Sequence, residues 1–199
     1  LLNDARWHAQ RREPQRRTGP DGRRIRGYGL IQPTMHDCGM NDATGTRVFI
    51  PHNTWAVYAD KVALDVARLL GKTQDIGELE AIYQAGREDL LATIDHGAIQ
   101  EDGYRWIPSS PGDPSGSFWG ALNTVHPCGL LGLDDPLVEG TITKMESFQS
   151  VGGLTKFTGW QKEGLWIAVV LDNLGMVYLA RGESDKFARQ LYAAVNHAS

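Results

Sequence analysis

Apolar side chains recur along the chain at helical spacing, whereas the alternating pattern of a half-buried strand is scarce. This spacing predicts a helix over residues 54–70, ended by Gly71, and a second over residues 76–96, ended by Gly97. The apolar stripe of the first helix consists of Trp55, Tyr58, Val62, Val66 and Leu69. The pattern therefore favours an all-α fold.

Four further helices are predicted after residue 117. They cover residues 118–131, 136–149, 164–181 and 184–198. Pro127 interrupts the first, whereas Pro136 follows Asp135 and occupies a favourable first-turn position in the second. The helix over 164–181 is apolar nearly all round, which is typical of a helix buried on more than one side.

The connectors between the six predicted helices alternate in length. Residues 71–75, 132–135 and 182–185 are short, and each contains a glycine that can end one helix and an aspartate that can cap the next. Short connectors join antiparallel neighbours into αα-hairpins. Three hairpins in series place the long loops, residues 29–53, 97–117 and 150–163, together on one rim.

The long loops are rich in aromatic rings and carboxylates. Residues 29–53 read GLIQPTMHDCGMNDATGTRVFIPHN and include His36, Asp37, Asp42 and His52. Loops of this length inside compact domains are usually functional. Aromatic faces stack on the C–H faces of pyranose rings, and carboxylates, amides and histidines bind hydroxyl groups, so this rim is typical of a carbohydrate site.

Charge and cysteine content argue against nucleic-acid-binding, disulfide-rich and membrane proteins. Residues 1–28 contain eight arginines and three acidic residues, whereas the remainder is acidic in balance. We expect this basic segment to be solvated and to lie along the acidic body, and we expect no nucleic-acid partner. Cys38 and Cys128 form no disulfide framework. With no signal-peptide pattern and no long apolar run, we expect a cytoplasmic protein without a membrane partner.

Several segments resemble the (α/α)6 six-hairpin glycosidases, in particular their bacterial members. The segments are YGLIQPTMHDCGMND, FIPHNTWAVYADKVALDVARLLGKTQD, WIPSSPGDPSGSFWGALNTVHPCGLLGLDDPLVEGTI and GGLTKFTGWQKEGLWIAVVLDNLGMVYLARGESD. The resemblance covers about residues 28–199, so we divide the chain into a basic N-terminal segment, 1–28, and a glycosidase-like domain, 29–199. It implies inverting hydrolysis of a glycosidic bond by a carboxylic acid and a carboxylate base.

Two carboxyl groups about 6.5–9.5 Å apart are needed for inverting hydrolysis. The resemblance implies that Asp37 is the general acid, and Glu163 is the best candidate for the second carboxylate. The alternatives are that Asp37 shapes its own loop and that Glu163 complements a helix dipole. The predicted substrate-binding residues are His36, Asp42, His52, Asn53, Trp55, Trp106, Trp119, Trp160 and Trp166.

The chain accounts for only half of the family's toroid, with three hairpins where a full ring has six. Half a ring exposes apolar helix faces, so we expect a homodimer or a missing remainder of a longer chain. The chain opens with Leu1 rather than Met, which agrees with a missing upstream region.

Three alternatives stay open at this point. One is a non-catalytic carbohydrate-binding or assembly module. Another is a lyase or uronide hydrolase of the same fold, which would use basic and Tyr or His groups such as Arg47, Tyr104, Arg105, His126 and Lys156. The third is a metal site built from His36, Asp37, Asp42 and His52, although metal-binding spacing is absent and we expect no metal or cofactor.

Overall fold

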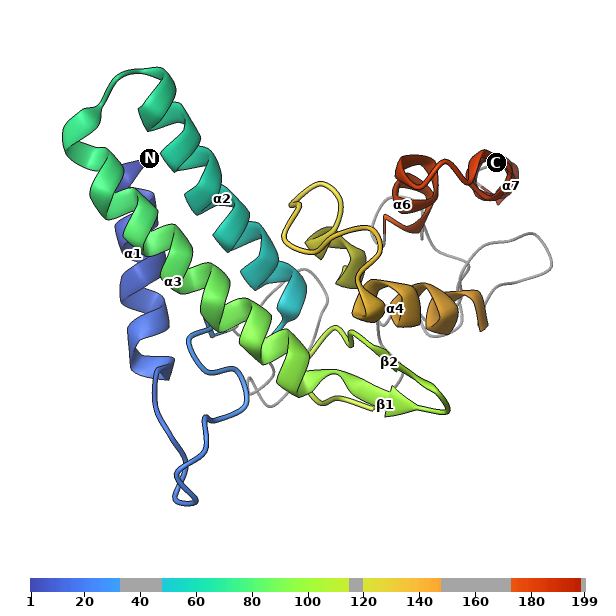
Figure 1. Ribbon diagram of the computed structural model, residues 1–199, viewed down its shortest axis with the longest axis horizontal. Helices are drawn as coiled ribbons and strands as arrows, with labels where there is room; N and C mark the ends of the chain where they lie inside the picture. The colour runs from blue at the N-terminus through green and yellow to red at the C-terminus, as the bar shows by residue number, and fades with distance from the viewer. Residues whose placement is uncertain (33–47, 115–119, 148–172, 198–199) are drawn as a thin grey trace. The chain divides into compact units, whose positions relative to one another are not determined.

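The computed structural model describes residues 1–32, 48–114, 120–147 and 173–197 of the chain, and this part is mostly helical (Figure 1). The chain forms two compact units, residues 1–96 and residues 97–199. The expectation of a predominantly α-helical protein is confirmed. No helix in the described ranges is both long enough and apolar enough to cross a membrane.

The described part of the first unit consists of the helices α1 (Leu2–Arg12), α2 (Ile50–Leu69) and α3 (Thr73–Gly97), with one turn of 3-10 helix, η1 (Glu13–Gln15). Helices α2 and α3 form the predicted αα-hairpin (Figure 1), and Gly71 in the turn has a φ of +65°, a conformation that glycine adopts without strain. Small side chains on α2, among them Ala63 and Ala67, pack with Leu79 of α3 and Ala5 of α1. The core of this unit therefore lies among the three helices.

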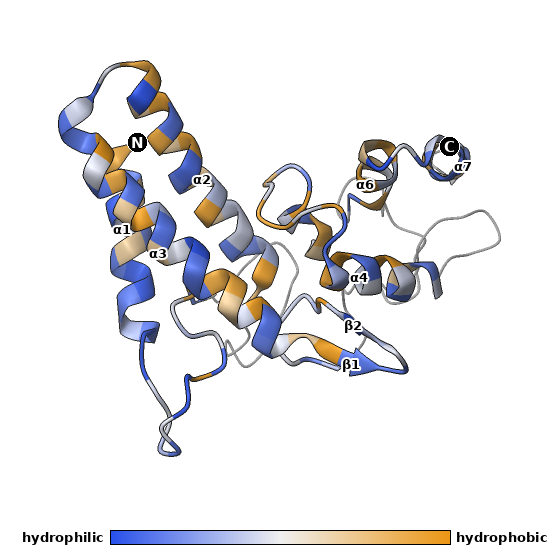
Figure 2. Ribbon diagram, in the orientation of Figure 1, coloured by the Kyte–Doolittle hydropathy of each residue, from blue (hydrophilic) through white to orange (hydrophobic). Residues whose placement is uncertain are grey.

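Hydrophobic and hydrophilic residues alternate along helix α2 (Figure 2), and apolar side chains occur on two of its faces. The face buried in the unit consists of Val57, Asp60, Ala63, Leu64 and Ala67. The stripe predicted from the sequence is the other face, on which Trp55, Val62 and Leu69 are exposed at 45%, 38% and 84%. Periodicity identified the helix correctly but not the side that is buried, because the buried side is built from small residues and an aspartate.

Helix α1 was not predicted, and a buried ion pair fixes it to α2. Arg12 Nη1 donates to Asp60 Oδ2 at 2.7 Å, and both side chains are 1% exposed. His8 Nδ1 lies 2.6 Å from the other carboxylate oxygen of Asp60. Gly86 of α3 makes room for the guanidinium group, since a Cβ there would lie 2.5 Å from Arg12 Nη1. The N-terminal segment thus lies against the body, as expected, but as a helix with a buried arginine.

Replacing Gly86 with alanine tests this packing. The added methyl group displaces the Arg12 guanidinium from Asp60, and we expect a loss of about 2–3 kcal/mol in the free energy of unfolding. Gly77, on the same helix, has open space around its Cα, so Gly77→Ala is the matched control and should stabilise α3 by about 0.5–1 kcal/mol. Urea unfolding of both variants measures the difference, and a Gly86→Ala protein as stable as Gly77→Ala contradicts the assignment.

The second unit begins with an antiparallel hairpin of two short strands, β1 (Ile99–Glu101) and β2 (Tyr104–Trp106), within a segment predicted to be a loop. Helix α4 (Pro136–Ser147) packs on β2, and their backbones are so close at Gly140 that a Cβ would lie 1.8 Å from the carbonyl oxygen of Arg105. The N–H of Ile107 donates to the hydroxyl of Thr141 at 3.0 Å. Glycine at position 140 is therefore a requirement of this packing.

Helices α6 (Leu174–Ala180) and α7 (Ser184–His197) follow one another in the second unit and pack together across a short turn that contains Gly182, as predicted. Glu146 of α4 binds both of them, because it accepts a hydrogen bond from the hydroxyl of Tyr178 at 2.7 Å and from Lys186 Nζ at 2.9 Å. Hydrogen bonds to Glu146 thus connect α4 to both α6 and α7.

Two of the predicted helices differ from the structure. Over residues 120–131 the chain forms a 3-10 helix, η2 (Ala121–Thr124), followed by turns, because Gly120 is left-handed and Pro127 has no N–H to donate to a continuing helix. Of the helix predicted over 164–181, the structure describes α6, which begins at Leu174 after Asn173 with a φ of +55°, whereas residues 164–172 lie outside the described residues. Helices α4 and α7 begin at the predicted residues.

Aspartates were expected to cap the helices that follow the short connectors. Asp135 does so before α4, since its carboxylate accepts the N–H of Leu137 at 2.8 Å. Asp75 and Asp185 instead lie inside the first turns of α3 and α7, where a negative charge complements the helix dipole. Only one of the three connectors therefore contains the predicted cap.

Candidate functional site

The first turn of α2 binds the start of the long loop that was predicted over residues 29–53 and whose last four residues belong to α2. The carboxamide oxygen of Asn53 accepts the N–H of Ile31 at 2.7 Å, and its amide nitrogen donates to the carbonyl oxygens of Ile31 at 3.2 Å and Phe49 at 3.0 Å. Asn53 is 1% exposed. Its side chain therefore closes the base of the loop, and both of its N–H donors are already used there.

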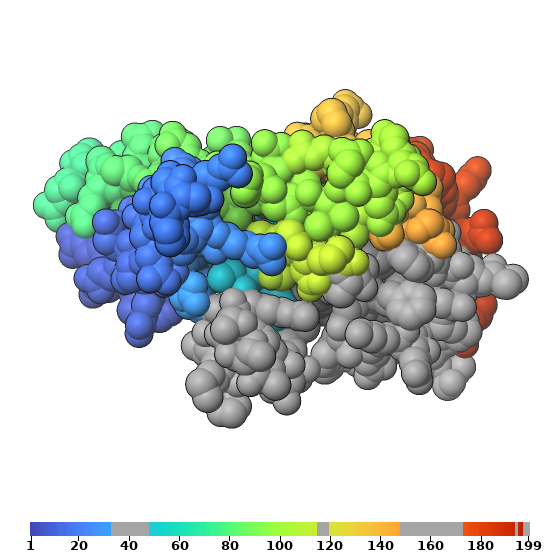
Figure 3. All heavy atoms as spheres, turned by 90° about the horizontal axis from the view of Figure 1, so that it is seen from below, coloured from blue at the N-terminus to red at the C-terminus, as the bar shows by residue number. Residues whose placement is uncertain are grey.

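The chain just before this loop is fixed along α3. The hydroxyl of Thr93 donates to the carbonyl oxygen of Tyr28 at 3.2 Å, and the N–H of Gly29 donates to the carbonyl oxygen of Gln15 at 3.2 Å. Gly29 lies against Asp89, since a Cβ there would lie 2.2 Å from the carboxylate. Figure 3 shows the N-terminal segment in blue on the surface beside the green α3. The long loop thus starts from a firmly held position.

The end of the loop is held as well. Val48 and Phe49 are buried, and Ile50, the first residue of α2, is completely buried. The rings of Phe49 and His52 make an edge-to-face contact with 5.5 Å between their centroids, and Trp55 makes a similar contact with Tyr58 at 5.9 Å. The exposed ring of Trp55 has a free surface on which a sugar can stack, so this predicted role is compatible with the structure.

Most of the predicted site lies outside the described residues. Both predicted catalytic carboxylates, Asp37 and Glu163, belong to this group, so the predicted separation between them stays a prediction. The same holds for the predicted substrate-binding residues His36, Asp42, Trp119, Trp160 and Trp166. Among the predicted residues, the structure brings together His52, Asn53 and Trp55 on the first two turns of α2.

Trp106 is in a different environment from the one its predicted role requires. It is 0% exposed, with Lys144 Nζ over its ring at 5.1 Å from the centroid. The ring has no exposed face on which a sugar can stack, so the structure lends no support to substrate binding by Trp106, and this role stays a prediction. The reason is the β-hairpin, which turns this part of the predicted loop into a strand that packs on α4.

A charged cluster around Glu101 connects the same hairpin to α4. Lys144 Nζ binds one carboxylate oxygen of Glu101, and the hydroxyl of Tyr104 donates to the other at 2.7 Å. The hydrogen bond from Lys144 lowers the pKa of Glu101, and burial together with Glu101 raises the pKa of Tyr104 to about 12. Nothing in the spacing along the chain indicates the ion pair, because its two residues are 43 positions apart.

This cluster stabilises the contact between the hairpin and α4 and shows no group prepared for catalysis. Glu101 stays ionised and Tyr104 stays protonated, and each has the other as partner. A tyrosine that removes a proton, as a lyase requires, needs a lowered pKa, which is the opposite of the shift found here. The cluster therefore lends no support to Tyr104 as a catalytic base. Arg47 and Lys156, named for the same alternative, lie outside the described residues.

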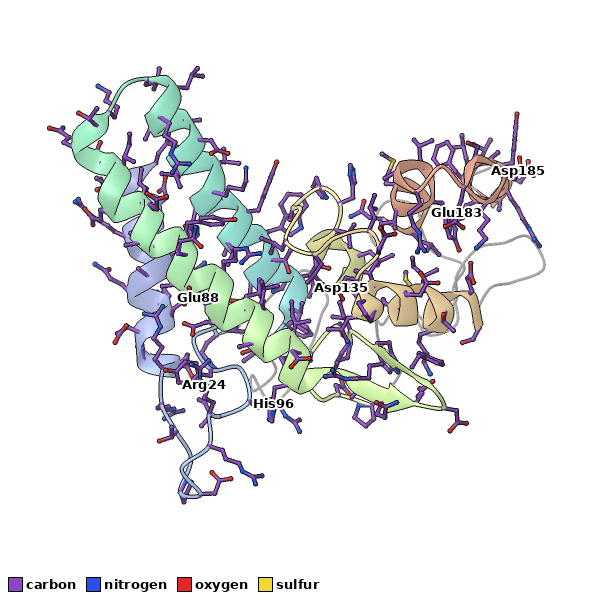
Figure 4. All side chains as sticks on the ribbon, in the orientation of Figure 1. Arg24, Glu88, His96, Asp135, Glu183 and Asp185 are labelled. Atoms are coloured by element: carbon purple, nitrogen blue, oxygen red, sulfur yellow. The ribbon has the colours of Figure 1, made fainter. Side chains whose placement is uncertain are left out.

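A shallow hollow lies at the start of α7, and its walls are formed by residues 182–186. Lys186 Nζ is 2.9 Å from Glu183 Oε2 and 2.9 Å from Glu146 Oε1, so its charge is neutralised. Figure 4 labels Glu183 and Asp185 there. This hollow is in a short connector, contains none of the predicted site residues, and is poorly suited to an anion because two carboxylates, Glu183 and Asp185, line it.

Within the described ranges, no group of three or more His, Cys, Asp or Glu side chains is arranged to hold a metal ion. Of the predicted alternative metal ligands, only His52 is among these residues. Burial raises the pKa of the Cys128 thiol to about 12, so this cysteine is an unreactive core residue.

Comparison of the chain with protein-family models, with curated proteins and with solved structures gave no match. The resemblance to six-hairpin glycosidases therefore stays a prediction from the motifs in the sequence.

Truncation of Asn53 tests whether this residue closes the loop. In Asn53→Ala the N–H and C=O of Ile31 lose their partner, and we expect a loss of about 1–3 kcal/mol in the free energy of unfolding. Hydrogen exchange at the Ile31 amide should become faster by at least tenfold. Lys61→Ala, which removes an exposed side chain on the same helix, is the control and should leave that exchange unchanged. Equal exchange in both variants contradicts the assignment.

Proposed function

We propose that the chain is part of a glycoside hydrolase that cleaves a glycosidic bond in an oligo- or polysaccharide by inversion, with Asp37 as the general acid. The observation that supports this most directly is the anchoring of the loop that contains Asp37. Asn53 binds the loop's start, and the buried Phe49 holds its end, both at the beginning of α2. A catalytic acid needs this kind of fixed support, since small displacements of a reacting group cost rate.

The described residues beside the loop add a suitable surface. Trp55 exposes its ring one turn after His52, and a pyranose stacked there would lie next to the base of the loop. Asn53 is committed to the backbone, so we assign it to holding the loop rather than to the sugar. His52, one turn before Trp55 on α2, remains our candidate for binding a sugar hydroxyl.

In the proposed reaction, the protonated carboxyl group of Asp37 donates to the glycosidic oxygen as the bond to the leaving group breaks. A carboxylate on the opposite face of the sugar takes a proton from water, which attacks the anomeric carbon and inverts it. Glu163 is our candidate for this base, and a carboxylate from another subunit is the alternative. The roles of Asp37 as acid and Glu163 as base both rest on the similarity of the sequence motifs.

Replacing Asp37 with asparagine tests the acid. We expect kcat on unactivated oligosaccharides to fall by about 10²–10⁴-fold because protonation of the leaving group is lost. Aryl glycosides with good leaving groups should be affected less, since they need little protonation. Asp42→Asn should mainly raise KM, and Asp102→Asn, at an exposed position of the second unit, should change neither constant. Undiminished turnover in Asp37→Asn removes this residue as the acid.

A non-catalytic carbohydrate-binding or assembly module is the second candidate, and the exposed stripe on α2 favours it. Trp55, Val62 and Leu69 are exposed along the whole length of that helix. We propose that a second copy of the chain covers the part of this stripe around Val62 and Leu69 and leaves the ring of Trp55 free, because adjacent exposed apolar side chains favour a partner surface. We also propose that the protein is located in the cytoplasm.

Solution mass measured by light scattering tests the homodimer. We expect a dimer for the unmodified chain and a shift toward monomer, by at least tenfold in the dissociation constant, for Val62→Lys, because a charge in the apolar contact is desolvated. Gln84→Lys adds the same charge at an exposed position of α3 and should remain dimeric. A monomeric unmodified chain overturns the proposal.

A further inference from the structure

The segment between α1 and the candidate loop forms a small, well-defined loop rich in arginine, residues 17–26, which we call the arginine loop. Its two sides pair at Thr18 and Arg24, and the N–H of Gly19 donates to the carbonyl oxygen of Arg23 at 2.8 Å. The carboxylate of Asp21 accepts the N–H of Arg23 at 3.1 Å, which shapes the turn. The loop extends beyond the end of α1 at the bottom of Figure 1.

The arginine loop is attached to α3 by the residues on either side of its tip. Arg16 Nε donates to Asp89 Oδ2 at 2.8 Å, and Arg24 lies over the ring of Tyr28 at 4.2 Å with Asp89 3.9 Å away. Figure 4 labels Arg24 beside the lower part of α3. These contacts hold the loop in one place on the first unit, and they neutralise Asp89.

Three arginines of this loop are left for a partner. Arg17, Arg23 and Arg26 are exposed, and none of them forms an ion pair with a carboxylate of the described residues. Three other exposed cations of the same unit are paired, Arg6 with Glu78, Lys61 with Asp65 and Arg68 with Glu80, whereas Arg11 and Lys72 form no ion pair among the described residues and lie singly on other elements. The loop is therefore a concentrated positive charge on a chain whose net charge is −4.

We propose that the arginine loop binds an anionic glycan, a polysaccharide whose sugars carry carboxylate or sulfate groups, and so defines the substrate class of the neighbouring site. Guanidinium groups bind carboxylates and sulfates through paired hydrogen bonds, and three of them on a fixed loop favour repeated anionic groups over a single one. The inference rests on the proposed function for its link to hydrolysis, because the loop leads directly into Tyr28–Ile31 at the base of the long loop.

An anionic glycan fits this chain better than a nucleic acid does. Nucleic-acid-binding domains are usually basic over a whole face or domain, whereas this chain has a pI of about 5.9. The arginines without an ion pair are concentrated in one short loop, which leads along the chain to Ile31, bound by Asn53 of α2. A flexible polymer with widely spaced anionic groups can reach such a loop without bringing a dense array of phosphates near the acidic body.

The test compares two triple variants of equal charge by calorimetric titration with polygalacturonate, dextran sulfate, neutral dextran and duplex DNA. In R17Q/R23Q/R26Q we expect at least tenfold weaker binding of the anionic glycans. In R6Q/K61Q/R68Q, which removes three paired cations, we expect less than a threefold change. Binding should weaken with added salt in the unmodified protein, and neutral dextran should show no dependence on the arginine loop.

The outcomes separate the two proposals. Preference for polygalacturonate or for dextran sulfate identifies carboxylate or sulfate as the group recognised, and either supports the inference. Equal losses in the two triple variants, or tighter binding of duplex DNA than of both anionic glycans, overturn it. Binding is measured without turnover in Asp37→Asn protein, so loss of the hydrolase assignment leaves this result intact. A chain that hydrolyses neutral glycosides but binds no anionic glycan retains the proposed function and loses the inference.

Discussion

The buried ion pair between Arg12 and Asp60 is the interaction on which the first unit depends. A charge removed from water is costly, and it persists only when its partner and its surrounding space are both present. Asp60 supplies the partner from α2, and Gly86 supplies the space from α3. The pair therefore needs all three helices at once, which a purely apolar contact between two helices does not.

The position of α1 determines the path of the chain beyond it. From the end of α1, Arg16 reaches Asp89 of α3, and the backbone then runs along α3 to Tyr28, bound by Thr93. Two residues after Gly29 the chain arrives at Asn53, which fixes the start of the long loop. A sequence of polar contacts thus connects the N-terminal helix to the segment that contains the predicted catalytic acid.

The sequence predicts elements well where apolar periodicity and glycine stops agree, as they do for α2 and α3. It fails where tertiary contacts override local pattern. Helix α1 is polar, and its burial depends on the ion pair between Arg12 and Asp60, which the local sequence does not reveal. In α2 the exposed face carries larger apolar side chains than the buried face, so the apolar pattern indicates the wrong side. For the site, the predicted roles of the loop and of Trp55 stay predictions, and the role of Asn53 in binding the backbone was not predictable, because its partner Ile31 is 22 residues away.

Gly86 also has a consequence for the order of events during synthesis. The chain is made from its N-terminus, so Arg12 exists well before Asp60, 48 residues later, and before Gly86, which lies later still. Until α3 has been completed, α1 has no place in which its arginine can be buried, and the guanidinium group stays hydrated. Helix α1 is accordingly synthesised before its partners but joins the fold after them, and for that interval its cationic side chains are accessible to whatever surrounds the nascent chain.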